Sequence, residues 1–118
     1  MTGDRAMTTA SDSTSSAQGQ PPESLRALAE YLEFSLDKGK SLVMMRHGTD
    51  VCSVYVGDPS DEESDLTPRG TIATALADEI LEFTYSGANQ ITVGDQTYRF
   101  FRSFTHVANV GAVVFAPL

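Results

Sequence analysis

The chain is poor in cysteine, in basic residues and in long apolar runs, and each shortage excludes a class of protein. A single cysteine, Cys52, cannot form an intrachain disulfide or a cysteine metal site. Sixteen Asp and Glu residues against eight Lys and Arg give a net charge of −8, which repels nucleic acid at long range. No apolar run approaches the ~18 residues of a membrane-spanning helix. We therefore expect no nucleic-acid partner, no membrane insertion, no metal ion and no other cofactor.

The first twenty residues are predicted to form a disordered tail. Residues 1–16 are rich in Ser, Thr and Asp, and their only large apolar side chains are Met1 and Met7. Such a segment cannot bury enough apolar surface to offset the entropy lost on ordering. Residues 21–118 are then expected to form a single small domain. A chain of that size buries roughly 60–65% of its unfolded surface, which suffices for one core.

The expected location follows from the N-terminal composition and the lone cysteine. No apolar segment of the kind found in cleaved secretory signals is present near Met1. A single cysteine suits a reducing compartment, so the sequence favours a cytoplasmic location. The Ser/Thr-rich tail resembles the leader of some bacterial secreted effectors. A bacterial effector or antigen exported without a cleaved signal is therefore an alternative, which deletion of residues 1–20 would test.

Two segments have the apolar spacing of amphipathic helices. The first is predicted over 22–38, with Pro and Glu in its first turn and Gly39 as a left-handed cap. The second is predicted over 67–85, where a Thr-Pro pair supplies the N-cap and the first turn. The expected buried faces are Leu25, Leu28, Ala29, Leu32 and Leu36 in the first helix, and Ile72, Ala75, Leu76, Ile80 and Phe83 in the second.

Five further segments are rich in β-branched and aromatic residues and are predicted to be strands. They are residues 41–46, 51–56, 90–93, 96–104 and 110–116. Short turns join the first pair and the third and fourth, so neighbouring strands are expected to pair antiparallel. The last segment is apolar on both faces and is expected inside the sheet. The predicted fold is α+β in the order α-β-β-α-β-β-β, with two helices packed on one face of a mainly antiparallel four- to five-stranded sheet.

Two short motifs carry a resemblance to a known family. Arg46-His47-Gly48 closes an apolar strand, and Leu66-Thr67-Pro68-Arg69-Gly70 comes at the head of the second predicted helix. Together they are similar to the opening motifs of the histidine phosphatase, or phosphoglycerate mutase-like, superfamily over roughly residues 41–80. The resemblance implies that His47 would accept a phosphoryl group while Arg46 holds its oxygens. Such chemistry uses a neutral imidazole as nucleophile and guanidinium groups to stabilise the charge on the transferring oxygens.

The rest of that family's catalytic set has no counterpart in the chain. After the second helix the family supplies a further Arg, whereas residues 85–87 lead here into a predicted hairpin. The family's second catalytic His is followed by Gly, but His106, the only other histidine, is followed by Val107. The family's sheet is mostly parallel, which requires long crossover connections. An enzyme is therefore the less favoured interpretation, and a phosphatase-like protein or degenerate relative that uses His47 is kept as an alternative.

Two other features are better explained by structure than by chemistry. The loop at 57–65 carries five carboxylates but lacks the glycine of an EF-hand, so a solvated acidic loop is favoured over a metal site. Cys52 alternates with Val54 and Val56, which predicts a buried thiol rather than a nucleophile activated by a histidine.

Arg99 and Phe101 mark the surface that we expect to bind a partner. Strand alternation places both on the face opposite Tyr98 and Phe100. Arg99, Phe101 and Arg102 mix basic and aromatic character, as sheets that bind RNA do, but two arginines on a chain of charge −8 favour a protein contact. We therefore predict a small soluble domain without catalytic function, which interacts with a protein partner or, through a free edge strand, with its own copy.

Overall fold

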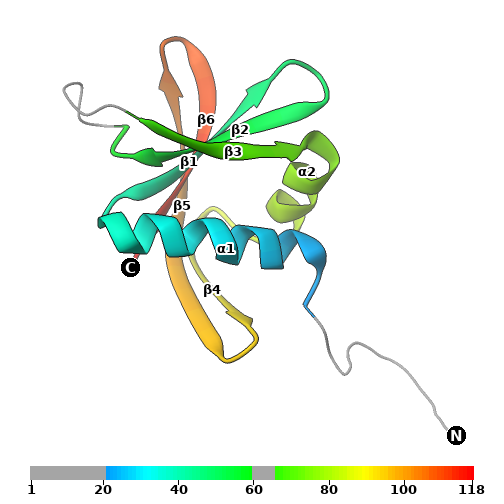
Figure 1. Cartoon of the computed structure of the whole chain (residues 1–118), viewed down its shortest axis with the longest axis vertical. Helices are drawn as coiled ribbons and strands as arrows, with labels where there is room; N and C mark the ends of the chain where they lie inside the picture. The colour runs from blue at the N-terminus through cyan, green and yellow to red at the C-terminus, as the bar shows by residue number, and fades with distance from the viewer. Residues whose placement is uncertain (1–20, 60–65) are drawn as a thin grey trace, which may run out of the picture.

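The computed structural model describes residues 21–59 and 66–118 (Figure 1). The predicted tail at 1–20 and the residues at 60–65 of the acidic loop lie outside the described residues. The elements are α1 (Glu23–Lys38), β1 (Ser41–His47), β2 (Val51–Gly57), β3 (Thr67–Ala73), α2 (Thr74–Phe83), β4 (Gly87–Val93), β5 (Gln96–Val107) and β6 (Val110–Pro117). Neither of these helices is long and apolar enough to cross a membrane.

The six strands form one antiparallel sheet in the order β3-β2-β1-β6-β5-β4. The predicted hairpin of β1 and β2 is confirmed, with Met44 opposite Val54. β6 lies between β1 and β5, so its apolar character on both faces correctly indicated a strand inside the sheet. The α+β class is confirmed, but the sheet has six strands where four to five were predicted.

The first half of the second predicted helix is a strand. Residues Thr67–Ala73 form β3, and α2 begins only at Thr74. β-branched residues favour a strand once a neighbour offers partners, and Ile72 lies opposite Cys52 of β2. Pro68 is tolerated because β3 is an edge strand, where one side of the ladder needs no donor. The order is therefore α-β-β-β-α-β-β-β rather than the predicted α-β-β-α-β-β-β.

Helix α1 begins and ends where its sequence predicts. Gly39 adopts the left-handed conformation with φ 66°. Its N–H donates to the carbonyl of Leu36, and the N–H of Lys40 donates to the carbonyl of Ser35, which satisfies the last carbonyls of the helix. The predicted apolar stripe is buried at Leu28, Ala29 and Leu32, but Leu36 is half exposed.

The core lies between the two helices and one face of the sheet. Both helices lie on the same side of the sheet in Figure 1, and side chains from both join one apolar cluster with the strands. Phe100 and Phe115 are fully buried at its centre, with ring centroids 5.6 Å apart in an edge-to-face arrangement. Cys52 is 3% exposed within this cluster, so the buried position predicted for it is confirmed.

Candidate protein-binding surface

Neither α1 nor α2 covers the second face of the sheet. Strand alternation places there the residues that lie between the core positions. We call this surface the open face. Its residues are Val43, Met45, Val51, Ser53, Tyr55, Thr71, Ala88, Gln90, Thr92, Thr97, Arg99, Phe101, Ser103, Thr105, Val107, Ala112, Val114 and Ala116.

The centre of the open face is apolar. Val43 is opposite Val114 on the neighbouring strand, and Ala112 is opposite Met45. Val43, Ala112 and Val114 are all buried, yet none of them belongs to the apolar cluster under the helices. The strands β1 and β6 therefore form an apolar floor on their second face as well.

Phe101 rises beside this floor with its ring exposed. Its cross-strand neighbours are Ala88 on β4 and Ala116 on β6. Because alanine side chains are short, neither can cover the ring, and 47% of Phe101 remains accessible. The predicted exposure of Phe101 is thus explained by small residues on both sides of it.

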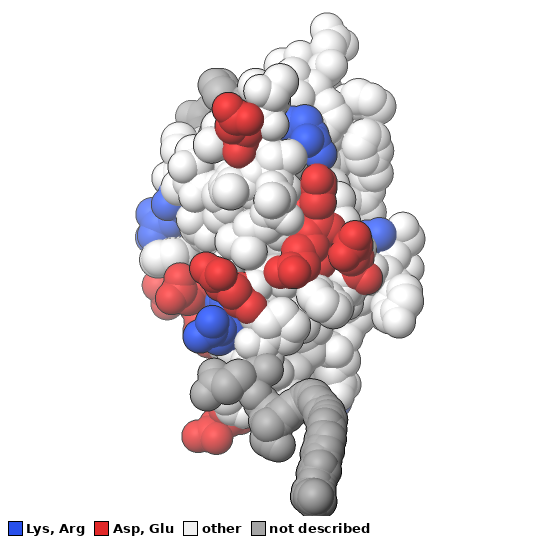
Figure 2. Space-filling model, turned by 90° about the vertical axis from the view of Figure 1, so that its right-hand side faces the viewer, with Lys and Arg blue, Asp and Glu red and all other residues white. Residues whose placement is uncertain are grey.

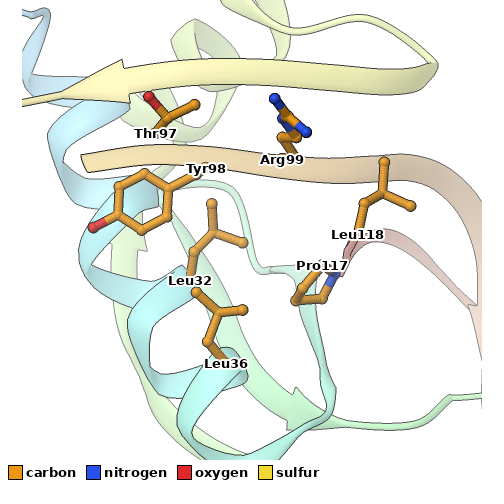
Figure 3. A pocket seen from close by; sticks show the side chains of 7 residues that line it. All are labelled: Leu32, Leu36, Thr97, Tyr98, Arg99, Pro117 and Leu118. Carbon is orange, nitrogen blue, oxygen red and sulfur yellow. The ribbon is translucent and has the colours of Figure 1, made fainter.

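Arg99 lies two residues before Phe101 on the same face of β5. It is exposed, and its Nε donates to Oε1 of Gln90, its cross-strand neighbour, at 3.1 Å. Figure 3 shows Arg99 on one side of β5 and Tyr98 on the other, where Tyr98 lies near Leu32 of α1. Arg99 and Phe101, which we predicted from the sequence to form a contact patch, therefore lie side by side on one face of the sheet.

Among the described residues, no Asp or Glu lies on this surface. Every Asp and Glu in the described part of the chain lies in a helix, a turn or a loop, and none lies in a strand. Figure 2 shows acidic side chains gathered over the middle of one view, whereas the right-hand margin of that view carries none. Arg99 is the one charged residue among those of the open face. A chain of net charge −8 thus presents a surface almost free of charge.

The residues that carry the phosphatase resemblance contact different helices. Arg46 forms an ion pair with Asp78 of α2, with Nη2 and Oδ1 3.2 Å apart. The guanidinium of Arg69 lies 4.4 Å from the ring centroid of Phe34 in α1. Leu66 precedes β3 and residues 67–70 lie within it, so the second motif does not lead directly into a helix. The alternative in which His47 takes part in phosphoryl transfer stays a prediction.

A second surface beside α2 was missed by the sequence analysis. Phe104 lies on the helix side of the sheet, but α2 does not cover it and 64% of the residue is exposed. Its ring lies over Gly111, where an added Cβ would come within 2.8 Å of the ring. Phe104, Val113, Met44 and Leu81 line a groove of about 340 Å³. A glycine one strand away from an aromatic residue is the sequence signal that could have indicated this packing.

Arg102 is the other residue whose role the sequence did not reveal. It interrupts the aromatic face of β5, and it reaches the C-terminal end of α2. Its Nη1 lies 3.1 Å from the carbonyl oxygens of Leu81 and of Thr84, and 2.8 Å from Oγ1 of Thr84. This arginine is therefore a helix cap rather than part of the exposed basic and aromatic patch.

Neither a metal site in the described residues nor similarity to known proteins indicates a function. In residues 21–59 and 66–118 no three His, Cys, Asp or Glu side chains gather where they could hold a metal ion. Comparison of the chain with protein-family models, curated proteins and solved structures gave no match. The features that indicate a function are therefore the geometry of the open face and of the sheet edges.

Proposed function

We propose that this chain is a non-catalytic protein-binding domain that holds a partner protein against its open face. The observation that supports the proposal is the exposed ring of Phe101 beside Arg99, on a surface to which the described residues contribute no carboxylate. Aromatic residues and arginine contribute much of the binding free energy in protein interfaces, while charged residues are depleted at interface centres. Toward the middle of the sheet, Val43 and Val114 are buried, so the main accessible apolar side chain of this face is that of Phe101.

The chemistry of the open face indicates what the partner would offer. The exposed ring of Phe101 suits an apolar side chain, and Arg99 suits a carboxylate or a backbone carbonyl beside it. Long-range attraction contributes little for an acidic partner, because the remainder of the molecule repels it. Short-range burial of the Phe101 ring is therefore expected to supply most of the affinity.

Substitutions on the two sides of the sheet test this proposal. Wild type is used to capture a partner, which is then purified and titrated against wild type and against Phe101→Ala, Arg99→Ala and Phe34→Ala. We expect Phe101→Ala to weaken binding at least tenfold and Arg99→Ala to weaken it several-fold. Phe34→Ala is the matched control, because Phe34 is 40% exposed on α1.

The result that overturns the proposal is equally specific. Equal dissociation constants for wild type, Phe101→Ala and Arg99→Ala would exclude the open face as the binding surface. Circular dichroism spectra of the variants check that each remains folded, so that a loss of binding is not a loss of structure. A partner whose binding depends on Phe34 instead would move the site to the helices.

A further inference from the structure

The two edges of the sheet differ in how they are protected against pairing. On β3, Pro68 has no N–H to offer, and the register shifts at Arg69, between the pairs of Val54 and Tyr55. β4 has neither device: Gly87–Val93 contains no proline and no charged residue, and its pairing with β5 is regular throughout. Natural sheets usually block an exposed edge with such devices, so the outer edge of β4, which pairs with no other described strand, is suited to a partner strand.

The unpaired groups of β4 can be assigned from its hairpin. Gly94 and Asp95 form a two-residue turn that closes on the pair Val93 and Gln96. In such a turn the closing pair is hydrogen-bonded, and the bonds then alternate along the strand. The N–H and C=O groups of Ala88, Gln90 and Thr92 consequently face away from β5.

The start of this edge is held rigidly. The side chain of Asn89 accepts from the N–H of Tyr85 at 2.9 Å and donates to the carbonyl of Tyr85 at 2.7 Å. It also donates to the carbonyl of Gly87 at 3.1 Å. These bonds hold the connection between α2 and β4 in one conformation. A strand that binds this edge therefore meets a template that needs little further ordering.

We propose that β4 pairs antiparallel with β4 of a second copy of this chain, about a twofold axis at Gln90. The strand has seven residues and Gln90 is its midpoint, so this register pairs the whole strand with itself. It brings the outward-facing groups of Gln90 against those of Gln90 in the second copy, and those of Ala88 against those of Thr92. The two six-stranded sheets then become one continuous sheet.

Charge also favours a second copy at this edge. Two chains of net charge −8 repel each other, so a stable contact must avoid their carboxylates. Residues 87–93 contain none, and the cross-strand pairs of the proposed register are Gln with Gln, Ala with Thr, Asn with Ile and Gly with Val. This contact uses the outward backbone groups of β4 and not the side chains of Phe101 and Arg99, so it goes beyond the proposed function and does not depend on it.

Amide hydrogen exchange measured over a range of protein concentrations tests this contact directly. We expect the N–H groups of Ala88, Gln90 and Thr92 to become protected as concentration rises and the sedimentation coefficient moves to that of a dimer. Asn89 and Ile91 face β5 and should show the same protection throughout. A monomer at all concentrations, or a dimer in which the three outward amides stay unprotected, would overturn the proposal.

Introducing a charge at the edge provides a second test with a matched control. Gln90→Lys places two cations across the twofold axis and is expected to give a monomer where wild type is dimeric. Thr71→Lys puts the same charge on the open face at the other edge of the sheet, on β3, and should leave the dimer unchanged. Equal association of the two variants would count against pairing through β4.

Cross-linking reports the register. Hydrogen-bonded antiparallel pairs have Cα atoms about 5.5 Å apart, within the range that a disulfide spans. Oxidation of Gln90→Cys should give a covalent dimer much faster than oxidation of Thr71→Cys. Cys52 is 3% exposed and does not compete with an exposed thiol. Cross-linking at equal rates would show random collision and refute the twofold contact, while leaving the test of Phe101 unaffected.

Discussion

Removing the guanidinium of Arg102 should loosen the C-terminal end of α2. That helix lacks a left-handed glycine cap, because Thr84 at its end is extended with φ −126° and ψ 165°, and its last turn contains no basic residue. Arg102 reaches across from β5 and donates to two carbonyls at this end of the helix. We expect Arg102→Met, which retains an apolar stem of similar length, to destabilise the fold measurably.

The magnitude follows from the contacts. Nη1 carries two protons and has three acceptors at 2.8 to 3.1 Å, so about two full hydrogen bonds are lost. Hydrogen bonds to charged groups contribute ~1.5–3 kcal/mol each, and the half-buried position of Arg102 lowers this figure through solvent screening. We expect a loss of about 2–3 kcal/mol in the free energy of unfolding. For a domain of this size that corresponds to a melting temperature lower by roughly 10–20 °C.

Urea denaturation of Arg102→Met and Arg99→Met measures the effect. The two arginines lie on the same strand, but Arg99 is exposed and makes one bond to Gln90, so its loss should change stability by less than ~0.5 kcal/mol. Hydrogen exchange should also show faster opening of the last turn of α2 in Arg102→Met. Equal stability of the two variants would refute the capping role.

Three further predictions can be tested, two from single contacts and one from the phosphatase alternative. The hydrogen bond that Tyr98 donates to Glu33, together with burial and the charge of Glu33, raises the pKa of Tyr98 to about 12. The folded state therefore holds this proton more tightly than the unfolded state does. The free energy of unfolding should fall between pH 10 and 12 in wild type, and should fall less in Tyr98→Phe. Gly70→Ala should cost ~1 kcal/mol because its Cβ would lie 2.6 Å from Oη of Tyr31, and Tyr31→Phe should restore most of that loss in a double-mutant cycle. Wild type should hydrolyse an aryl phosphate no faster than buffer, and turnover that His47→Ala abolishes would instead support the phosphatase alternative.

Local signals predicted those parts of the fold that local chemistry determines. The bounds of α1 follow from Pro22 before its first turn and Gly39 after its last, both of which act through their own backbone. The turn at Gly94 was predicted for the same reason, since its positive φ of 63° suits glycine. Phe101 was predicted to be exposed from strand alternation alone.

The boundary between β3 and α2 could not be predicted in this way. A Thr-Pro pair suits a helix start as well as an edge strand, and the choice depends on whether β2 offers a free edge for pairing. The role of Arg102 was hidden for a related reason. Its acceptors lie 18 to 21 residues away in the sequence and come within reach only when α2 packs on the sheet.

Salt should strengthen the dimer that we propose at β4. Each copy carries a net charge of −8, and screening of their mutual repulsion increases as the Debye length falls from ~30 Å at 0.01 M to ~8 Å at 0.15 M. Residues 87–93 contain no charged group whose attraction the same salt could weaken. The dissociation constant from sedimentation equilibrium should therefore fall several-fold over this range. A constant that rises with salt would show that ion pairs hold the copies together, and the contact would then lie on a charged surface away from β4.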